Sequence, residues 1–312
     1  MTTLMAADAL VVGEALVDVV HDAAGEVAEH PGGSPANVAV GLARLGRPTT
    51  LLTDLGEDRY GDLLADHLSA EGVGLLLPRR PGAATSYATA RLRPDGSAAY
   101  SFAVDWRLPA IPAPTGPRIV HTGSLAAVAA PGADVVENLL RALADRATIS
   151  YDLNIRPSVM GEAELPARVA RIAALADIVK ASDEDLAALA PGVPLEEAAR
   201  RLLDLGPAAV VVTRGGDGAW CLTRSGATAV PAPPVVVADT IGAGDSFCAA
   251  IIDRLWDHDV LGAPARPRLR SMRQADWSDV LGYAAAAAAV TVSRPGADPP
   301  TRAEIAAPLS RR

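Results

Sequence analysis

The chain has 312 residues, of which half are hydrophobic and only 4% aromatic, so aliphatic side chains must fill most of the core. This length suits one large α/β domain or two ordinary ones. The net charge of −9 argues against nucleic acid as a partner, but it leaves local phosphate sites open. No apolar run approaches the ~18 residues that span a bilayer, and two cysteines form no disulfide framework. We therefore expect a cytoplasmic protein with no membrane partner.

Short apolar strands alternate with helical segments along most of the chain. The first elements predicted are a strand, a helix, a strand and a helix, at Leu10–Val20, Pro35–Leu45, Thr49–Thr53 and Tyr60–Glu71. Four more strands are predicted further along, at Ile119–His121, Ile149–Asp152, Ile178–Lys180 and Val210–Thr213. Because helical segments separate these strands, the pattern predicts a mostly parallel sheet with helices on both faces.

Two segments interrupt this alternation. Thr85–Arg93 and Ala98–Val104 flank a Pro-Asp-Gly-Ser turn at residues 94–97, which predicts an antiparallel hairpin. A second strand pair lies between Val17 and Val27, around a polar turn at residues 22–25. We expect a single domain over residues 1–312, in which the segments at about 17–31 and 84–106 form a small β-sheet lid.

The last third of the chain contains a strand-to-helix junction with an acidic residue in it. Val235–Ala238 predicts a buried strand and Phe247–Trp256 a helix. Between them, Gly242, Ala243 and Gly244 would expose backbone N–H groups at a helix N-terminus, where the helix dipole also favours an anion. Asp245 follows directly. A carboxylate beside a bound anion suits phosphoryl transfer to a hydroxyl, because the hydroxyl proton needs an acceptor. Taken alone, Asp245 is equally well explained as a helix N-cap.

The segment after this helix, His258–Ala275, is rich in proline and arginine and predicts an exposed loop.

Lysine is almost absent from the chain. Of the 28 basic residues, 27 are arginines and one is Lys180. Two interpretations are open: this lysine has survived by chance, or its position needs a compact ammonium that a guanidinium cannot replace.

A second glycine-containing motif begins at Gly32 and reads Gly-Gly-Ser-Pro-Ala-Asn. Paired glycines let a ligand approach the backbone closely. Pro35 suits the first turn of a helix, and the Asn37 amide can both donate and accept hydrogen bonds. Alone, this motif is more typical of a helix-initiating loop than of a site.

With both motifs in this order, the chain resembles the ribokinase-like sugar kinases, also called PfkB carbohydrate kinases, over nearly its whole length. The resemblance implies a ribokinase-like α/β fold with a small β-sheet lid. It also implies transfer of the ATP γ-phosphate to a primary hydroxyl of a sugar. A P-loop kinase is excluded, because the sequence lacks the Gly-x-x-x-x-Gly-Lys-Ser/Thr pattern.

The resemblance assigns roles to individual residues. Asp245 matches the family's catalytic base, and Gly242, Ala243 and Gly244 match its anion hole. The residues implied to bind the sugar are Asp18, Gly32, Gly33, Asn37, Asn154 and Arg156. The residues implied to bind the nucleotide are Lys180, Ser182, Thr213, Gly215 and Gly218.

The resemblance also implies ions. Glu184 and Asp185 are the candidates to hold Mg²⁺, through water if not directly, although Ser182 and Asp185 replace the asparagine and glutamate of the family pattern. Asp239, together with Gly296, is a candidate site for a monovalent cation such as K⁺.

Within the family the chain is most similar to fructokinases, by its His121–Leu125 segment and by the segment that begins Asp152-Leu153-Asn154. The preferred substrate is therefore D-fructose, with fructose 6-phosphate as product. Two alternatives are a 2-keto-3-deoxygluconate kinase and a ribokinase or nucleoside kinase. An alternative of another class is a catalytically impaired, sugar-binding regulatory protein. Relatives often pair through their lid strands, which implies a homodimer.

Overall fold

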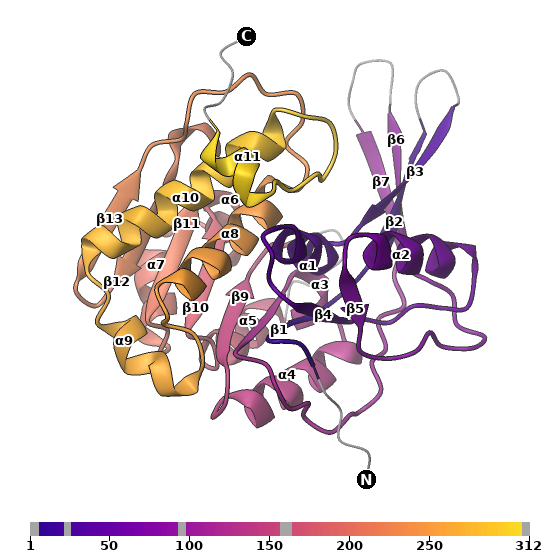
Figure 1. Ribbon diagram of the computed structural model, residues 1–312, viewed down its shortest axis with the longest axis horizontal. Helices are drawn as coiled ribbons and strands as arrows, with labels where there is room; N and C mark the ends of the chain where they lie inside the picture. The colour runs from indigo at the N-terminus through magenta and orange to yellow at the C-terminus, as the bar shows by residue number, and fades with distance from the viewer. Residues whose placement is uncertain (1–5, 22–25, 93–97, 157–163, 308–312) are drawn as a thin grey trace.

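The structure is a computed structural model that describes residues 6–21, 26–92, 98–156 and 164–307 (Figure 1). In this part of the chain a nine-stranded sheet forms the centre, in the order β13-β12-β11-β10-β9-β8-β1-β4-β5. These strands are β13 (Gly226–Val230), β12 (Ala219–Thr223), β11 (Ala209–Thr213), β10 (Ile178–Ser182), β9 (Thr148–Asp152), β8 (Ile119–Gly123), β1 (Ala9–Val12), β4 (Thr49–Leu52) and β5 (Val73–Leu75). The pairs from β11 to β5 are parallel, whereas β12 and β13 add an antiparallel hairpin. The predicted mostly parallel sheet is confirmed.

Helices cover both faces of this sheet, as predicted. One face packs against α1 (Ser34–Arg44), α2 (Arg59–Ala70), α8 (Ala243–Asp257) and α10 (Gln274–Val292). The other face packs against α3 (Ser124–Val128), α4 (Gly132–Leu143), α5 (Leu165–Ala173), α6 (Asp183–Leu189) and α7 (Leu195–Asp204). The remaining short helices are η1 (Gly215–Asp217), η2 (Ala263–Ala265), α9 (Arg266–Arg270) and α11 (Arg302–Ala306). Across the described ranges, the search for a membrane span finds no helix of the required length and apolarity.

Side-chain alternation along each strand divides the core into two layers. In β11, Val211 contributes to the layer beneath α1, α8 and α10, whereas Val210 and Val212 contribute to the layer on the other face. In β10, Ile178 lies on the α8 face, so Lys180, two residues later, points the same way. The strand period therefore directs the single lysine toward the helix that carries Asp245.

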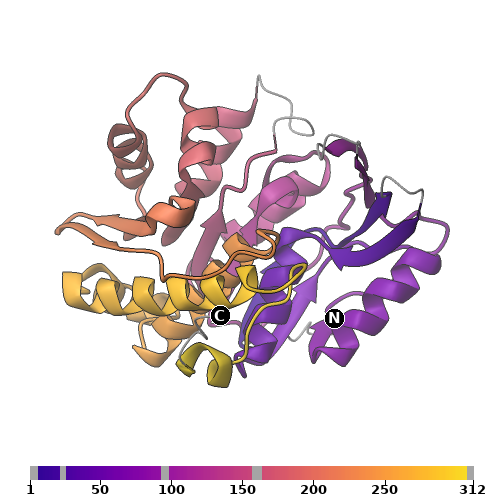
Figure 2. The same ribbon diagram turned by 90° about the horizontal axis from the view of Figure 1, so that it is seen from above.

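A second, small sheet stands beside the large one. It has the order β3-β2-β6-β7, with strands at Val27–Gly32, Leu16–His21, Tyr87–Leu92 and Ala98–Ala103. Strands β2 and β6 are parallel, and each pairs with an antiparallel partner at the edge. Figure 2 shows this sheet at one side of the molecule, near α2. The two turns predicted at residues 22–25 and 94–97 lie outside the described residues.

Three predicted elements are wrong in detail. The single strand expected over Leu10–Val20 is two strands, because β1 pairs with β4 and β8 in the large sheet while β2 pairs with β3 and β6 in the small one. The buried strand expected at Val235–Ala238 is an extended segment, and Val236 is 70% exposed. Its Ala238 N–H donates to the carbonyl of Val292, at the end of α10, instead of to a strand.

The exposed loop expected at His258–Ala275 is also wrong. This segment contains η2, α9 and the start of α10, and it buries Leu261, Leu269 and Met272. The prediction took the arginines of this segment as a sign of exposure. Arg266 instead forms an ion pair with the buried Asp177, whose Oδ1 lies 2.6 Å from the Arg266 Nε.

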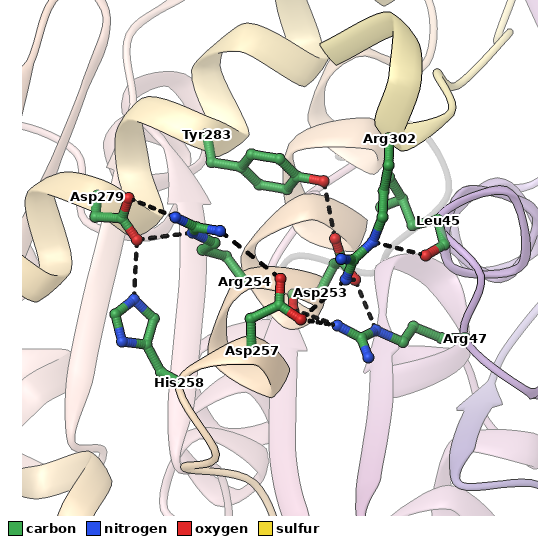
Figure 3. Close-up of polar contacts among 9 residues, drawn as sticks. All are labelled: Leu45, Arg47, Asp253, Arg254, Asp257, His258, Asp279, Tyr283 and Arg302. Carbon is green, nitrogen blue, oxygen red and sulfur yellow. Dashed lines mark hydrogen bonds and ion pairs between the residues drawn. The ribbon is translucent and has the colours of Figure 1, made fainter. Parts of the chain in front are cut away.

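A polar network fixes the C-terminal end of α8 (Figure 3). The Asp253 side chain is fully buried there and accepts hydrogen bonds from Arg47, Arg302 and the Tyr283 hydroxyl. Arg254, on the same helix, makes a two-pronged ion pair with Asp279 of α10. These contacts hold α8 against α10, α11 and the end of α1.

Asp253→Ala should lower the free energy of unfolding by about 3 kcal/mol, because it leaves two guanidinium groups and a hydroxyl without their buried acceptor. Urea denaturation measures this change. As a matched control, Glu197→Ala removes the partner of Arg201 in an exposed pair, which should cost less than about 1 kcal/mol. Equal losses in both variants would contradict the special role of the network.

Candidate active site

The predicted site residues collect at one edge of the large sheet. Strands β1, β8, β9, β10 and β11 run parallel, so their carboxyl ends lie together. The segments that follow these strands carry Glu14, Ser124, Asn154, Asp185 and Gly215. Open α/β sheets bind ligands at this edge, and α8 brings Asp245 to the same place.

The glycine turn before Asp245 forms the N-terminus of α8. The helix begins at Ala243, four residues earlier than predicted, and its N-cap is Gly242 in a left-handed conformation with φ of 74°. Asp245 is therefore not the N-cap, which removes the purely structural explanation of this residue. The first N–H groups of a helix have no partner one turn earlier within the helix; of these, the Ala243 N–H donates to the Thr240 carbonyl at 3.3 Å.

The Asp245 carboxylate is held by two donors from α1. The Ser34 hydroxyl donates to Asp245 Oδ1 at 2.6 Å, and the Asn37 amide donates to Oδ2 at 2.8 Å. Helix α1 begins with Ser34, so two helix N-termini meet around this carboxylate. The two glycine motifs that are far apart in the sequence thus form one site.

Lys180 lies beneath the glycine turn. Its Nζ is 3.1 Å from Asp152 Oδ2, and a Cβ placed on Gly244 would be 3.1 Å from the same Nζ. Burial alone would lower the pKa of the Lys180 ammonium, but the Asp152 carboxylate raises it, so Lys180 stays charged. The Cys248 thiol donates to Asp152 at 3.3 Å from the facing helix. An ammonium is thereby fixed against the backbone of the predicted anion hole.

Three cavities meet at this turn. Thr240 and Gly244 line all of them. The first, of about 460 Å³, is largely apolar and is bounded by Thr213, Gly215, Gly218 and by the misassigned segment through Val235 and Val237. The second, of about 370 Å³, contains Asp245 and the predicted sugar-binding residues Asp18, Gly33, Asn37, Asn154 and Arg156.

The second cavity is rich in carboxylates. Burial, reinforced by the negative charge of Asp245, raises the pKa of Asp18 to about 6, although His30 acts in the opposite direction. Gly32 leaves room for this group, since a Cβ there would lie 2.2 Å from Asp18 Oδ2. Glu14 also lines the cavity, and burial raises its pKa to about 7 against hydrogen bonds that lower it.

The third cavity, of about 460 Å³, lies between Lys180, Arg156 and the start of α6. Ser182 is the N-cap of α6, and Asp185 completes a capping box with it. Asp185 Oδ1 also accepts the backbone N–H of Ile155 at 2.7 Å. Both oxygens of this carboxylate therefore serve the backbone, whereas Glu184 is exposed at the cavity edge. In the described residues, no group of three or more His, Cys, Asp and Glu side chains is arranged to hold a metal ion.

Asp239 connects the two loops beside the first turn of α8. Its oxygens accept the backbone N–H groups of Ile241 at 3.0 Å and Gly296 at 2.9 Å. Partial burial works against ionisation, but these backbone donors prevail and lower the pKa of Asp239.

The model of the pfkB family of carbohydrate kinases matches residues 6–304. The chain belongs to this family. It is thus a phosphotransferase that acts on a sugar hydroxyl, as the two motifs predicted.

Named relatives of this pfkB-family kinase act on more than one substrate. A fructokinase of Klebsiella pneumoniae is 32% identical over 260 residues, which cover 80% of this chain and 85% of that protein. The aminoimidazole riboside kinase of Salmonella typhimurium strain LT2 is 31% identical over 268 residues, which cover 80% and 83%. A solved structure of a Vibrio cholerae O395 fructokinase double mutant, with fructose, ADP and a potassium ion bound, has a TM-score of 0.80 at 28% identity and covers 96% of this chain and 98% of that one.

Three residues of the kinase site were not among those predicted. Ser34 contacts Asp245, Asp152 holds Lys180, and Glu14 lines the cavity with Asp18. Ser34 was inside the quoted glycine motif, but its partner is 211 positions away. Glu14 and Asp152 each interrupt or end an apolar run, and an acidic residue in such a run is the signal that would have found them.

Glu14→Gln should become more stable than the parent protein as the pH rises. The pKa of Glu14 is raised from 4.5 to about 7, so the stability linked to its neutral form is complete below about pH 4.5 and is lost as the pH rises through 7. Glutamine cannot ionise, so the variant should gain up to about 3 kcal/mol between about pH 5 and 8. Urea unfolding at both pH values measures this difference.

Glu304→Gln is the matched control. The Thr301 backbone N–H and Arg294 lower the pKa of Glu304 from 4.5 to about 2, so its contribution is already complete at pH 5. The control should lose stability by an amount that does not change between the two pH values. A pH-independent effect of Glu14→Gln would contradict the raised pKa.

Proposed function

We propose that this pfkB-family kinase transfers the γ-phosphate of ATP to a primary hydroxyl of D-fructose, giving fructose 6-phosphate and ADP. The observation that carries this proposal is that the apolar cavity, the carboxylate-rich cavity and the third cavity all meet at Thr240 and Gly244. A nucleotide in the first and a sugar in the second would bring their reacting atoms together beside Asp245.

Asp245 would act as the proton acceptor. As the sugar oxygen bonds to the γ-phosphorus, its proton passes to the Asp245 carboxylate and the bond to the β-phosphate oxygen breaks, releasing ADP. Ser34 and Asn37 hold the carboxylate in a single orientation. Asp18, whose raised pKa reflects its burial, would orient the sugar hydroxyls together with Asn37, Asn154 and Arg156.

Backbone N–H groups of Gly242, Ala243 and Gly244 would stabilise the charge on the transferred phosphoryl group. Lys180 adds a fixed positive charge at the same turn, since Asp152 holds its ammonium close to Gly244. Thr213, Gly215 and Gly218 border the apolar cavity, where the nucleotide base and its first phosphates would lie.

Two ions complete the proposal. Mg²⁺ would neutralise the triphosphate when bound, with its water ligands held by the exposed Glu184 carboxylate and by the remaining lone pairs of Asp185, while Ser182 lines the same cavity. A monovalent cation such as K⁺ would bind beside Asp239, where the carboxylate is kept ionised next to Gly296. The fructokinase structure with bound potassium supports the second ion.

The small sheet, about 17–31 and 84–106, would act as the lid of a single domain over residues 1–312. It borders the sugar cavity through Asp18, Ala88 and Phe102, so its closure would exclude water as a competing acceptor. We also propose a homodimer formed through this sheet, because Val27 and Tyr87 are 53% and 38% exposed on it.

The strongest second candidate is a nucleoside kinase. The riboside kinase relative is nearly as similar to this chain as the fructokinase is. A 2-keto-3-deoxygluconate kinase stays an alternative, because Arg156 and Lys180 line the second cavity together with its carboxylates and could pair with an anionic sugar. A catalytically impaired regulatory protein is disfavoured by the intact contacts of Asp245.

A substrate panel tests this proposal: ADP release with fructose, other ketoses, aldoses, 2-keto-3-deoxygluconate and nucleosides. Fructose should give the highest kcat/KM. Asp245→Asn, the matched control, should lower kcat by at least about 10²-fold while sugar and ATP still bind. A higher kcat/KM for a nucleoside than for fructose would show that fructose is not the preferred substrate. Near-normal turnover by Asp245→Asn would show that Asp245 is not the proton acceptor.

Lys180→Arg should lower kcat/KM for ATP by about 10- to 100-fold, because a guanidinium is too large for the space between Asp152 and Gly244. Steady-state kinetics with varied ATP measures this effect. Arg201→Lys, on the exposed face of α7, is the control for exchanging the two basic residues and should leave the kinetics unchanged. Parental kinetics in Lys180→Arg would mean that this lysine is a chance survivor.

A further inference from the structure

Glu14 occupies a joint between the two sheets. It lies in the three-residue link between β1, in the large sheet, and β2, in the small one (Figure 1). The residue is only 3% exposed, yet it lines the same cavity as Asp18 and Asp245. A buried carboxyl group needs hydrogen-bond donors, and the donors around Glu14 identify the segment that this residue holds in place.

The Glu14 carboxylate is engaged by the chain itself. Glu14 Oε2 accepts the backbone N–H of Ala126 at 3.0 Å, and the nearby Ser124 side chain acts to lower the pKa of this carboxyl. The carboxylate is therefore tied to the backbone at the start of α3.

The segment that Glu14 holds is a strained part of the cavity wall. Ser124 has a φ of 54°, a left-handed conformation that non-glycine residues adopt rarely and at a cost. It follows β8 directly, and both Ser124 and Leu125 line the cavity. Such a conformation persists when surrounding contacts impose it, and the hydrogen bond from the Ala126 N–H to Glu14, two residues further on, is such a contact.

The backbone of Glu14 contacts the helix that holds the proton acceptor. A Cβ on Gly33 would lie 2.6 Å from the Glu14 carbonyl oxygen, and Gly33 has a φ of 101°. Ser34, the next residue, donates to Asp245. On the other side, the Ala15 N–H donates to Thr53 Oγ1 at 3.1 Å and fixes the link to the large sheet.

We infer that Glu14 is a positioning residue of the sugar cavity: it holds the Ser124–Ala126 wall in place and ties that wall to the root of the small sheet and to the start of α1. This inference rests on the proposed function, because it assigns the carboxylate-rich cavity to the sugar. Glu14 would thus affect sugar affinity indirectly, by positioning the Ser124–Ala126 segment. The property of Glu14 that matters is the length of its side chain and not its charge.

Two variants separate reach from charge. Glu14→Gln keeps the length and an oxygen for the Ala126 N–H, but it removes the charge. Glu14→Asp keeps the charge but is one methylene too short to reach. We expect Glu14→Asp to raise KM for the sugar by about 10- to 100-fold with KM for ATP changed less than about twofold, and Glu14→Gln to stay within about threefold of the parent in both.

A double-mutant cycle tests the connection to the wall. Ser124→Ala removes the wall side chain that acts on the Glu14 carboxyl, so in the combination of Glu14→Asp with Ser124→Ala the two losses should not multiply. Multiplicative losses would overturn the inference, as would poor sugar affinity in Glu14→Gln with normal affinity in Glu14→Asp. Asp177→Asn is the control: this buried carboxylate accepts the Ile149 N–H at the opposite edge of the sheet, so its loss should lower Tm without changing KM for the sugar.

Sugar binding is measured in parallel as the thermal shift of each variant, without ATP, for the panel sugar that stabilises the parent most. If the parent protein binds sugar but phosphorylates none, the proposed function is rejected and the inference about Glu14 is not. The sugar affinities of the Glu14 variants, ranked against the parent, would then still decide the inference. If Glu14→Asp does not fold, Glu14→Gln and Ser124→Ala carry the test. Ser124→Ala must then weaken sugar binding and Glu14→Gln must not, and any other order would overturn the inference.

Discussion

The contact between Asp245 and the start of α1 is the interaction on which the rest of the site depends. Ser34 and Asn37 hold the two carboxylate oxygens from one helix, while the N-terminus of α8 holds the residue itself. Two helix N-termini concentrate backbone donors and positive potential at one point. The polar network at the far end of α8, around Asp253, keeps the helix in the register that this contact requires.

Buried charge is the second constraint. Lys180 and Asp152 face each other on neighbouring parallel strands, with Cys248 above them on α8. A buried ion pair contributes little to stability, because desolvation offsets much of its attraction. The pair instead fixes the position of the ammonium, which lies against Gly244 and lines both the cavity proposed for the sugar and the third cavity, proposed for Mg²⁺.

The first and second cavities differ in chemistry because different parts of the fold build them. Small apolar residues of α10 and of the extended Val235–Ala238 segment line the first, which suits a flat base. Loops after parallel strands line the second and bury several acids together, and this burial, with a smaller contribution from the Asp245 charge, raises the pKa values of Glu14 and Asp18. Burial of acids that would be unfavourable in an ordinary core thus occurs in the cavity that we propose for the sugar.

The sequence by itself determined the family, the parallel sheet, the small second sheet and the importance of the glycine turn before Asp245, because strand period, helix period and short motifs are local patterns. It misread Val235–Ala238 and His258–Ala275, where hydrophobicity and charge take their meaning from distant partners such as Val292 and Asp177. Only the tertiary structure decided that Ser34 holds Asp245, that Asp152 holds Lys180 and that Glu14 accepts the Ala126 N–H. These contacts join residues from 28 to 211 positions apart, and no local pattern records which distant donor a buried carboxylate will meet.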